Sequence, residues 1–499
     1  MPKATAPAAA SVPDPGAGEP ALRKDLNTFA LTTLIMGAMI GSGIFFLPGP
    51  MLKDVGQGGI WPVMAAWILG AAVALAGGLV FAELGAAFPK AGGQYAFLRD
   101  SLGKGWAFLF SWSSFTVLQT ATIAAVAIAM ANAVDGLVDL PGSNPCLGSE
   151  YLEAGETLCN GLTLPKWGTG FLAIAIIVLL TFVNYLGVKR GAWVSNGATV
   201  AKVAALIGIA GVAFGFGGSG AGNFSSGGWG AVTVLGFATA TSRSLFAYDG
   251  FAQATFVAAE VKDARKALPK AIVLATAIVA VVYLTATFAV FHIVPLDAIT
   301  ADELAANDPI ATHAMDLAVG GVAATLVLLA ITVSTFGTVN TYVLTSPRIY
   351  HPIARDGDFP RPFGVLSRHG TPTYGLVYGA VWAGVLTMTG SYDALAELVV
   401  FGLYIFYLAT MVGYFLLRRR EAEAFETAGF RMPLRPVPAV FFGLAAVAVL
   451  VNYVVNDALL LVDGHVGAFL ASTTGLGILL IGSGAVVYLV QRKATASPA

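Results

Sequence analysis

Charged residues are scarce in this chain of 499 residues. Lys, Arg, Asp and Glu make up 11 % of it, less than half of the roughly 25 % found in soluble domains. Apolar residues make up 57 %, and the mean hydropathy is +0.78. The scarcity of charge excludes a large soluble surface, and 27 basic against 28 acidic residues excludes the basic surface of a nucleic-acid binder. Two cysteines are too few for a secreted disulfide scaffold. The composition indicates a protein with many membrane spans.

Histidine is also scarce. The five His residues are scattered without the spacing of metal ligands, so we expect no metal site. The sequence contains no Ser/His/Asp set of the kind that an enzyme needs, and its glycine-rich stretches lack the lysine of a nucleotide-binding loop. We therefore predict neither catalysis nor a cofactor.

Long apolar runs follow one another from residue 29 onward. Each has roughly 18–28 residues, enough to cross about 30 Å of hydrocarbon. Residues 1–25 lack the basic and apolar regions of a signal peptide, so we predict a disordered cytoplasmic tail there, and a second cytoplasmic tail at residues 492–499. We predict twelve spans, near 29–52, 60–87, 105–134, 168–188, 193–216, 231–259, 269–293, 317–347, 372–391, 395–417, 436–455 and 466–490.

The basic residues orient these spans. With the N-terminus inside, every loop obeys the positive-inside rule, and acidic residues gather in the outer loops. Only Lys53 and Lys166 fall outside, while Lys202 and Arg243 fall within spans. One span more or fewer would place the basic loops after it on the outside. The distribution of basic residues therefore supports twelve spans. We predict a multi-pass protein of the cell membrane with both termini in the cytoplasm.

Glu83, Lys202, Arg243 and Asp249 lie within predicted spans. A charge in the middle of a bilayer is expensive, so such side chains face protein or a water-filled cavity. They form either structural ion pairs or part of a functional site, and the sequence leaves both readings open.

Glycine interrupts two of the spans. The first contains Gly37, Gly41 and Gly43 within seven residues, and the sixth contains Asp249 followed by Gly250. Such interruptions reflect either close helix packing through small residues or unwound backbone around a cavity. Their separation by five spans is typical of inverted five-helix repeats with a substrate site between two broken helices. Free N–H groups at one break would bind a carboxylate and free carbonyl groups at the other an ammonium, so the two breaks fit a zwitterion.

Four stretches resemble a known family. The run 37–45 resembles the first-helix motif of the amino acid–polyamine–organocation (APC) superfamily. The others resemble its L-type amino acid transporter branch, which includes bacterial serine/threonine-exchanger-like permeases. The resemblance covers residues 26–420 in order, and four motifs together are far more specific than any one. The three further stretches are 82–85 with 88–95, 245–250 with Glu260 and 268–272, and 334–340 with Arg348 and 354–357.

The resemblance implies an all-α membrane protein with a LeuT-like fold, in which helices 1 and 6 are broken. Ten helices would form two inverted repeats, and two peripheral helices would follow. The first repeat would cover residues 26–217 and the second residues 230–420, with the peripheral helices at 434–491.

The resemblance also implies a substrate site. Phe246 would close it from outside as a gate, and Asn340 matches a polar position near it. The substrate carboxylate would meet the backbone of Ile40, Gly41, Ser42, Gly43 and Ile44. The amino group would meet the carbonyls of Phe246, Ala247 and Asp249, together with that of Ile40, in the break that also contains Tyr248 and Gly250.

Lys202 matches a lysine that in relatives occupies the place of a bound sodium ion. The resemblance implies that its ammonium ties helix 5 to the break in helix 1 and to Ser334 on helix 8. It would act either as a fixed charge or as a carrier of a transported proton, and transport would be independent of sodium.

The implied function is secondary active transport of amino acids by alternating access, and neutral amino acids are the favoured substrates. Exchange, proton symport and facilitated flux all use this scaffold, so the coupling mode stays open. Many relatives carry Gly in place of Asp249, which supports an alternative: a transporter of polyamines or other organic cations with Asp249 as the counter-ion. Arg243 has no counterpart that we can name and favours the opposite specificity, so the substrate side chain stays open.

Cys146 and Cys159 both fall in the outer loop 135–167, which predicts an intraloop disulfide. Some relatives use a cysteine of this loop to join a single-span glycoprotein. Two cysteines favour pairing with each other, so we expect no heavy-chain partner. The expected partners are a small amino acid substrate and the lipid bilayer, without nucleic acid.

Overall fold

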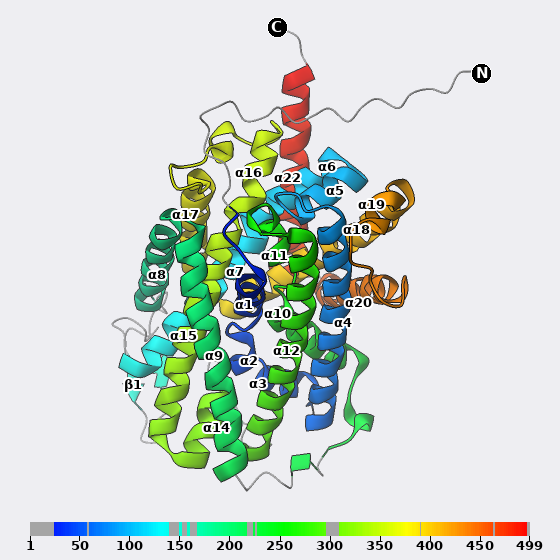
Figure 1. The fold of residues 1–499 in the computed structure, drawn as a ribbon. Helices are drawn as coiled ribbons and strands as arrows, with labels where there is room; N and C mark the ends of the chain where they lie inside the picture. Colours follow the sequence, from blue (N-terminus) through cyan, green and yellow to red (C-terminus); the bar gives the residue numbers. More distant parts are fainter. Residues whose placement is uncertain are drawn as a thin grey trace, which may run out of the picture.

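The computed structural model describes ten stretches of the chain. They are residues 24–56, 59–138, 149–151, 157–159, 167–216, 223–224, 227–295, 309–389, 391–462 and 465–496. Almost all of the predicted N-terminal tail therefore lies outside the described residues. Helices dominate the described part, and most run roughly side by side in one bundle (Figure 1).

Within the described part, ten helices are long and apolar enough to cross a membrane. They coincide with ten of the twelve predicted spans. The other two spans contain shorter helices: α10 (Val234–Tyr248) ends at a break, and α17 (Thr373–Thr389) has 17 residues. Each predicted span thus has a helix in the structure.

The helices of the spans have the following bounds. The first span comprises α1 (Thr28–Met39), α2 (Gly43–Phe46) and α3 (Pro48–Asp54), and the third comprises α6 (Lys104–Ser113), a π-helix (Ser114–Leu118) and α7 (Gln119–Val138). The sixth span continues after α10 as α11 (Gln253–Phe256). The remaining spans are α4 (Ile60–Ala87), α8 (Trp167–Tyr185), α9 (Val188–Phe216), α12 (Ala264–Ile293), α15 (Gly321–Thr345) with α16 (Pro347–Arg355), α17, α18 (Tyr392–Arg420), α20 (Val437–Val462) and α22 (Thr473–Ala496).

Short elements connect these spans. Two short strands, β1 (Ser149–Tyr151) and β2 (Thr157–Cys159), pair antiparallel. The prediction missed α5 (Gln94–Leu102), which lies between the second and third spans. The short helices are α5, α14 (Ile310–Val319), α19 (Ala422–Glu426) and α21 (Val466–Ala471).

The eighth span differs from its prediction at both ends. We predicted 317–347, but Gly320 has a φ of +97° and separates α14 from α15, which begins at Gly321. The apolar pattern runs across this glycine pair and hides the boundary. At the other end the helical path continues to Arg355, because Pro347 occupies the first position of α16, where proline fits a helix.

The centre of the bundle is α1, which packs against α9, α12 and α15. Small residues let these helices approach closely: a side-chain carbon placed on Gly337 of α15 would lie 2.5 Å from the Cβ of Ala198 on α9. Such contacts are typical of helix packing in membranes. They bring the middle of α9, and with it Lys202, against α1 and α15.

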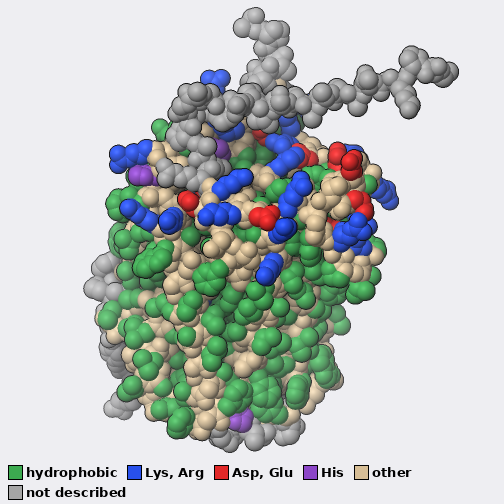
Figure 2. Space-filling view, in the orientation of Figure 1, with side chains coloured by type: hydrophobic (Ala, Val, Ile, Leu, Met, Phe, Trp, Pro, Cys, Tyr) green, Lys and Arg blue, Asp and Glu red, His purple; other side chains and the backbone are tan. Residues whose placement is uncertain are grey.

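The surface divides into an apolar body and one basic end. Figure 2 shows Lys and Arg side chains gathered at the upper end, above a surface that is mostly hydrophobic. Large apolar side chains such as Trp193 and Val234 are 78 % and 87 % exposed. Exposed apolar residues at this density need lipid around them. The protein is a multi-pass membrane protein, and we call the end that carries Arg99, Lys104 and Arg355 the basic end.

Hydrogen bonds and ion pairs hold the basic end together. The guanidinium of Arg348 on α16 lies 2.9 Å from the carboxylate of Glu260, and both side chains are buried. The backbone N–H of Leu26 donates to the carbonyl of Glu260 at 3.0 Å, and the N–H of Lys262 donates to the carbonyl of Leu26 at 2.8 Å. These contacts tie the start of the first span to the end of the sixth span.

Glu83 also lies toward this end and is completely buried. Its carboxylate accepts a hydrogen bond from the hydroxyl of Tyr414 at 2.7 Å and pairs with the guanidinium of Arg435. Of the two readings left open for the charges within spans, Glu83 follows the structural one.

Candidate functional site

The first break separates α1 from α2. Helix α1 ends at Met39, residues 40–42 are not helical, and α2 begins at Gly43. The N–H groups of Ile40 and Gly41 still donate to carbonyls of α1. Among the described residues, the next three N–H groups have no backbone acceptor: those of Ser42, Gly43 and Ile44. Backbone N–H groups left free at the start of a helix attract an anion.

The second break separates α10 from α11. Helix α10 ends at Tyr248, Asp249 has an extended backbone, and Gly250 has a φ of +135° that favours glycine. The two breaks touch. A side-chain carbon on Gly250 would lie 2.9 Å from the Cβ of Ala38, and one on Gly43 would lie 2.8 Å from the Cβ of Ala247. Glycine at both places lets the two unwound segments lie against each other.

Tyr283 on α12 joins the two breaks. Its buried hydroxyl lies 2.5 Å from the carbonyl oxygen of Met39 and 3.2 Å from that of Ala247. One side chain thus contacts the last residue of α1 and the last turn of α10. The sequence analysis missed it. The available signal was a lone tyrosine in an apolar span, since a buried tyrosine hydroxyl usually has a hydrogen-bond partner.

Lys202 lies beneath the first break and is completely buried. Its ammonium donates to the carbonyl of Gly37 at 3.0 Å, to the carbonyl of Ile40, and to the hydroxyl of Thr338 at 3.0 Å. The prediction placed this ammonium at the break and at Ser334. In the structure it reaches α15 through Thr338, while Ser334 donates to the carbonyls of Ile40 and Gly41 at 3.1 and 3.0 Å.

These contacts occupy the carbonyl of Ile40. The ammonium of Lys202 donates to it, and the hydroxyls of Ser334 and Thr338 lie within hydrogen-bond distance, at 3.1 and 3.0 Å. A carbonyl oxygen has two lone pairs, so these neighbouring donors satisfy it without a substrate ammonium. The structure therefore departs from the expected set of amino-group acceptors at this one residue.

Asp249 lies in the second break among tyrosines. Its two carboxylate oxygens accept from the hydroxyls of Tyr342 on α15, at 3.0 Å, and Tyr407 on α18, at 2.5 Å. Within the described ranges no Lys or Arg forms an ion pair with it. The ion pair that was one of the possibilities for Asp249 is therefore absent from the described residues. Two tyrosine hydroxyls bind its carboxylate instead. The two tyrosines were not predicted.

Aromatic side chains lie on the side of the breaks away from the basic end. The ring of Tyr392, at the start of α18, lies 6.1 Å from that of Phe246 and 5.7 Å from that of Phe46, measured between centroids. The hydroxyl of Ser42 lies 3.1 Å from that of Tyr392. Phe246 and Tyr392 thus form an aromatic pair beside the first break, and the sequence did not reveal Tyr392. The role of Phe246 as a gate stays a prediction.

Asn340 does not reach the breaks. Its side chain accepts from the amide of Asn184 on α8 and donates to the carbonyl of Gly191 on α9, both at 2.8 Å. Helix geometry explains the difference. Thr338 faces α1, and a residue two positions later points about 200° away around a helix. The polar position on this face of α15 is Thr338, four residues after Ser334.

Arg243 pairs with acidic residues away from the basic end. Its Nε lies 2.7 Å from a carboxylate oxygen of Asp54, at the end of α3, and a terminal nitrogen lies 3.7 Å from Glu397 on α18. The ion pairs connect α3, α10 and α18, so Arg243 follows the structural reading of a charge within a span.

This network predicts coupled effects of substitution. Arg243→Gln leaves Asp54 without its cation, and Asp54→Asn leaves Arg243 with Glu397 alone. Each change should lower the stability of the protein and its apparent unfolding temperature. The double variant should lose less stability than the sum of the two single variants, with a coupling free energy of about 0.5–3 kcal/mol. A thermal-unfolding cycle of the four proteins measures this coupling. Strictly additive shifts would show that the pair contributes nothing.

Comparison with known proteins decides the family. The family model described as amino acid permease matches residues 26–489. The chain belongs to the amino acid permease family. Its members are transporters, and the match extends the resemblance noted at residues 26–420 through the last two spans. The family together with the predominantly helical structure confirms the LeuT-like fold class, with helices 1 and 6 broken at 40–42 and 249–252.

Individual relatives agree with this permease family. The chain is 28 % identical over 483 residues to the serine/threonine exchanger SteT of Bacillus subtilis, a match that covers 95 % of this chain and 98 % of the relative. It is 29 % identical over 408 residues to the mouse b(0,+)-type amino acid transporter 1, covering 81 % and 78 %. The human Asc-type amino acid transporter 1 is also 29 % identical, over 426 residues, covering 82 % and 74 %.

Two expectations stay untested. Cys146 lies outside the described residues and Cys159 is described only as the last residue of β2, so the disulfide stays a prediction. The expected absence of a heavy-chain partner likewise stays a prediction.

Proposed function

We propose that this permease is a secondary transporter that binds a zwitterionic amino acid between its two helix breaks. The observation that carries the proposal is the set of free N–H groups at Ser42, Gly43 and Ile44, which lie against the end of α10 through Gly43 and Ala247. A carboxylate at these groups would bring the amino group of the same substrate toward the second break. A backbone site of this kind needs no charged side chain for either end of the substrate.

The amino group has its acceptors in the second break. We assign it to the carbonyls of Phe246, Ala247 and Asp249, and we leave out Ile40 because Lys202, Ser334 and Thr338 already surround its carbonyl with donors. Phe246 and Tyr392 would cover the substrate as the outer gate. Tyr248 and Gly250 shape the break, and Asn340 is not part of the proposed site.

Lys202 supports independence from sodium. Its ammonium contacts two carbonyls of the first break and a hydroxyl of α15, which are oxygen ligands of the kind that a bound metal cation would use. A fixed cation there would hold α1, α9 and α15 together in every cycle. We propose that no sodium ion is needed.

We further propose how the chain lies in the membrane. The basic end would face the cytoplasm of the cell membrane, as the positive-inside rule requires. Residues 26–217 and 230–420 would form the two inverted repeats, and alternating access would move one against the other around the breaks.

A neutral substrate fits Asp249 better than a cationic one. Both carboxylate oxygens already accept a hydrogen bond from a tyrosine, so the group is satisfied without a substrate ammonium. In the alternative, Asp249 is the counter-ion of a polyamine or cationic amino acid, and the remaining lone pairs of its carboxylate accept from the substrate ammonium. The names of the relatives, a serine/threonine exchanger among them, also support amino acids.

Asp249→Asn separates the two specificities. An amide still accepts from one tyrosine, so for a neutral substrate the affinity should stay within about tenfold, or about 1.4 kcal/mol. Inhibition of uptake by alanine, serine, leucine, arginine and putrescine in both proteins tests this. Strong inhibition by putrescine or arginine that disappears in Asp249→Asn would instead make the protein a cation transporter.

Uptake into proteoliposomes tests the proposed function itself. A panel of labelled amino acids is offered to vesicles with and without internal amino acid, with and without a pH gradient, and in sodium or choline buffer. We expect saturable uptake of at least one neutral amino acid that does not depend on sodium. Acceleration by internal amino acid would identify an exchanger, and absence of uptake for the whole panel would contradict the proposal.

A further inference from the structure

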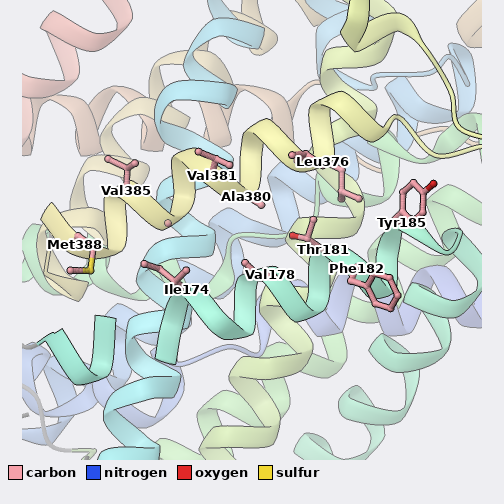
Figure 3. Close-up of a pocket in the computed structure, with 12 residues that line it drawn as sticks. Ile174, Val178, Thr181, Phe182, Tyr185, Leu376, Ala380, Val381, Val385 and Met388 are labelled. Atoms are coloured by element: carbon pink, nitrogen blue, oxygen red, sulfur yellow. The ribbon is translucent and has the colours of Figure 1, made fainter. Parts of the chain in front are cut away.

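An apolar groove runs along the lipid-facing side of the bundle between α8 and α17. Figure 3 shows side chains of the two helices facing each other along it, from Ile174 and Met388 at one end to Tyr185 and Leu376 at the other. Its volume is about 640 Å³. The small residues Ala380 and Gly384 and the side chain of Thr181 leave room between the larger apolar ones, among which Phe182 and Val381 are each 61 % exposed.

The groove has the length of one lipid leaflet. Residues 174–185 of α8 and 376–388 of α17 line it, which at 1.5 Å per residue corresponds to roughly 16–18 Å. Half of a hydrocarbon core is about 15 Å. Helix α8 continues for seven residues, 167–173, beyond the end of the groove that lies farther from the basic end. The groove therefore matches an acyl chain in the leaflet at the basic end.

Cations surround the opening of the groove at the basic end. The ring of Tyr185 lies edge-on to that of His369, with centroids 5.7 Å apart. Arg368 adjoins this histidine and donates to it from Nε at 3.1 Å. Lys189 and Arg190 follow on the other side, where a side-chain carbon on Gly187 would lie 3.8 Å from the carbonyl oxygen of His369. The connection between α8 and α9 thus lies beside the segment that precedes α17. These two neighbouring segments carry Lys189, Arg190 and Arg368.

These three cations are exposed. In the part of the chain that the structure describes, no Asp or Glu forms an ion pair with any of them. Other bases of this end differ, since Lys90 pairs with Asp100 and Lys104 with Asp358. Unpaired cations beside a membrane attract anionic headgroups, and basic pockets between spans bind them.

We propose that this groove and its three cations form a binding site for an anionic phospholipid. One acyl chain lies between α8 and α17 over Ala380 and Gly384. The phosphate lies at the level of Tyr185, an amphipathic ring of the kind found at membrane interfaces, and meets Lys189, Arg190 and Arg368. The site is separate from the helix breaks, since α8 and α17 contribute no residue to them.

Lipid binding to the delipidated protein tests the proposal. Native mass spectrometry would compare dioleoyl phosphatidylglycerol with dioleoyl phosphatidylcholine, which share their chains and differ in charge. We expect the anionic lipid to bind about tenfold more tightly to the wild-type protein. Equal binding of the two lipids would overturn the proposed headgroup site.

Two kinds of variant locate the bound lipid. Ala380→Trp fills the groove and should abolish the tight binding of the anionic lipid. If this variant does not fold, Gly384→Leu replaces it, because a side-chain carbon on Gly384 would lie 3.6 Å from a carbon of Ile174 across the groove. The triple variant Lys189→Gln, Arg190→Gln and Arg368→Gln should lose the preference for the anionic lipid. The control triple Lys262→Gln, Arg265→Gln and Lys270→Gln removes exposed cations at the start of α12 and should keep it.

Other occupants give different results. A sterol would stabilise the protein thermally where phosphatidylglycerol does not. A second copy would double the mass in light scattering and return to the monomer mass in Ala380→Trp. Either result, or tight phosphatidylglycerol binding that survives Ala380→Trp, would overturn the proposal.

Discussion

Gly43→Val should abolish amino acid uptake while the protein still folds. A single carbon on Gly43 would lie 2.8 Å from the Cβ of Ala247 and 3.3 Å from a methyl group of Leu47. A branched side chain would therefore push the two breaks apart and cover the free N–H groups of Ser42 and Ile44. We expect a loss of roughly 100-fold or more, equivalent to about 3 kcal/mol.

A glycine of the same segment supplies the control. Among the described residues, Gly49 on α3 has only a methyl group of Ile310, 4.0 Å away, near the position of an added carbon. Gly49→Val should keep uptake within a few fold, and both variants should elute as a single species in size-exclusion chromatography. Wild-type affinity in Gly43→Val would contradict the assignment of the site, because no carboxylate could then lie at this break.

Lys202 should be indispensable for its charge rather than for its volume. Lys202→Met keeps most of the side chain but removes the ammonium, so we expect Lys202→Met and Lys202→Ala both to lose uptake about 100-fold. Both proteins should fold, because the hydroxyls of Thr338 and Ser334 still connect α15 to carbonyls of the first break. Uptake assays in proteoliposomes measure the loss.

The sodium dependence of uptake tests whether Lys202 replaces a sodium ion. Replacing sodium by choline should leave wild-type uptake unchanged, and Lys270→Met, at an exposed lysine of α12, should behave like the wild type. Full activity in Lys202→Met would reduce the role of Lys202 to packing. Full sodium dependence of the wild type would show that the ammonium does not replace the ion.

The sequence predicted the backbone of the site because glycine and charge mark it locally. Gly41 and Gly43 beside Ser42, and Asp249 beside Gly250, are weak helix formers within otherwise apolar spans. Their positions identified both breaks, and the structure places both there. Lys202 was equally visible, since a lysine within a span must find oxygen partners.

The side chains around the breaks depend on contacts that no local pattern contains. Tyr283, Tyr342, Tyr407 and Tyr392 come from α12, α15 and α18 and meet the breaks only because of how these helices pack and rotate. Asn340 illustrates the same limit: it was assigned to the site on its resemblance alone, and the rotation of α15 turns it toward α8 and α9.

The ion pairs of the spans were visible only as single charges. The sequence showed that Glu83 and Arg243 needed partners but not that Arg435 and Asp54 supply them, because those partners lie 352 and 189 positions away along the chain. The pairing follows from the packing of the sixth span against the end of the first, and of α4 against the segment before α20.

Competition by altered substrates tests most directly whether backbone groups bind a zwitterion. The labelled amino acid that is taken up best would compete with the same amino acid, its methyl ester and its N-acetyl derivative. We predict that only the unmodified amino acid competes well, with each derivative weaker by about 100-fold because one end loses its charge-assisted hydrogen bonds. Equal competition by the ester or the N-acetyl derivative would contradict the account, since one of the two breaks would then not hold the substrate.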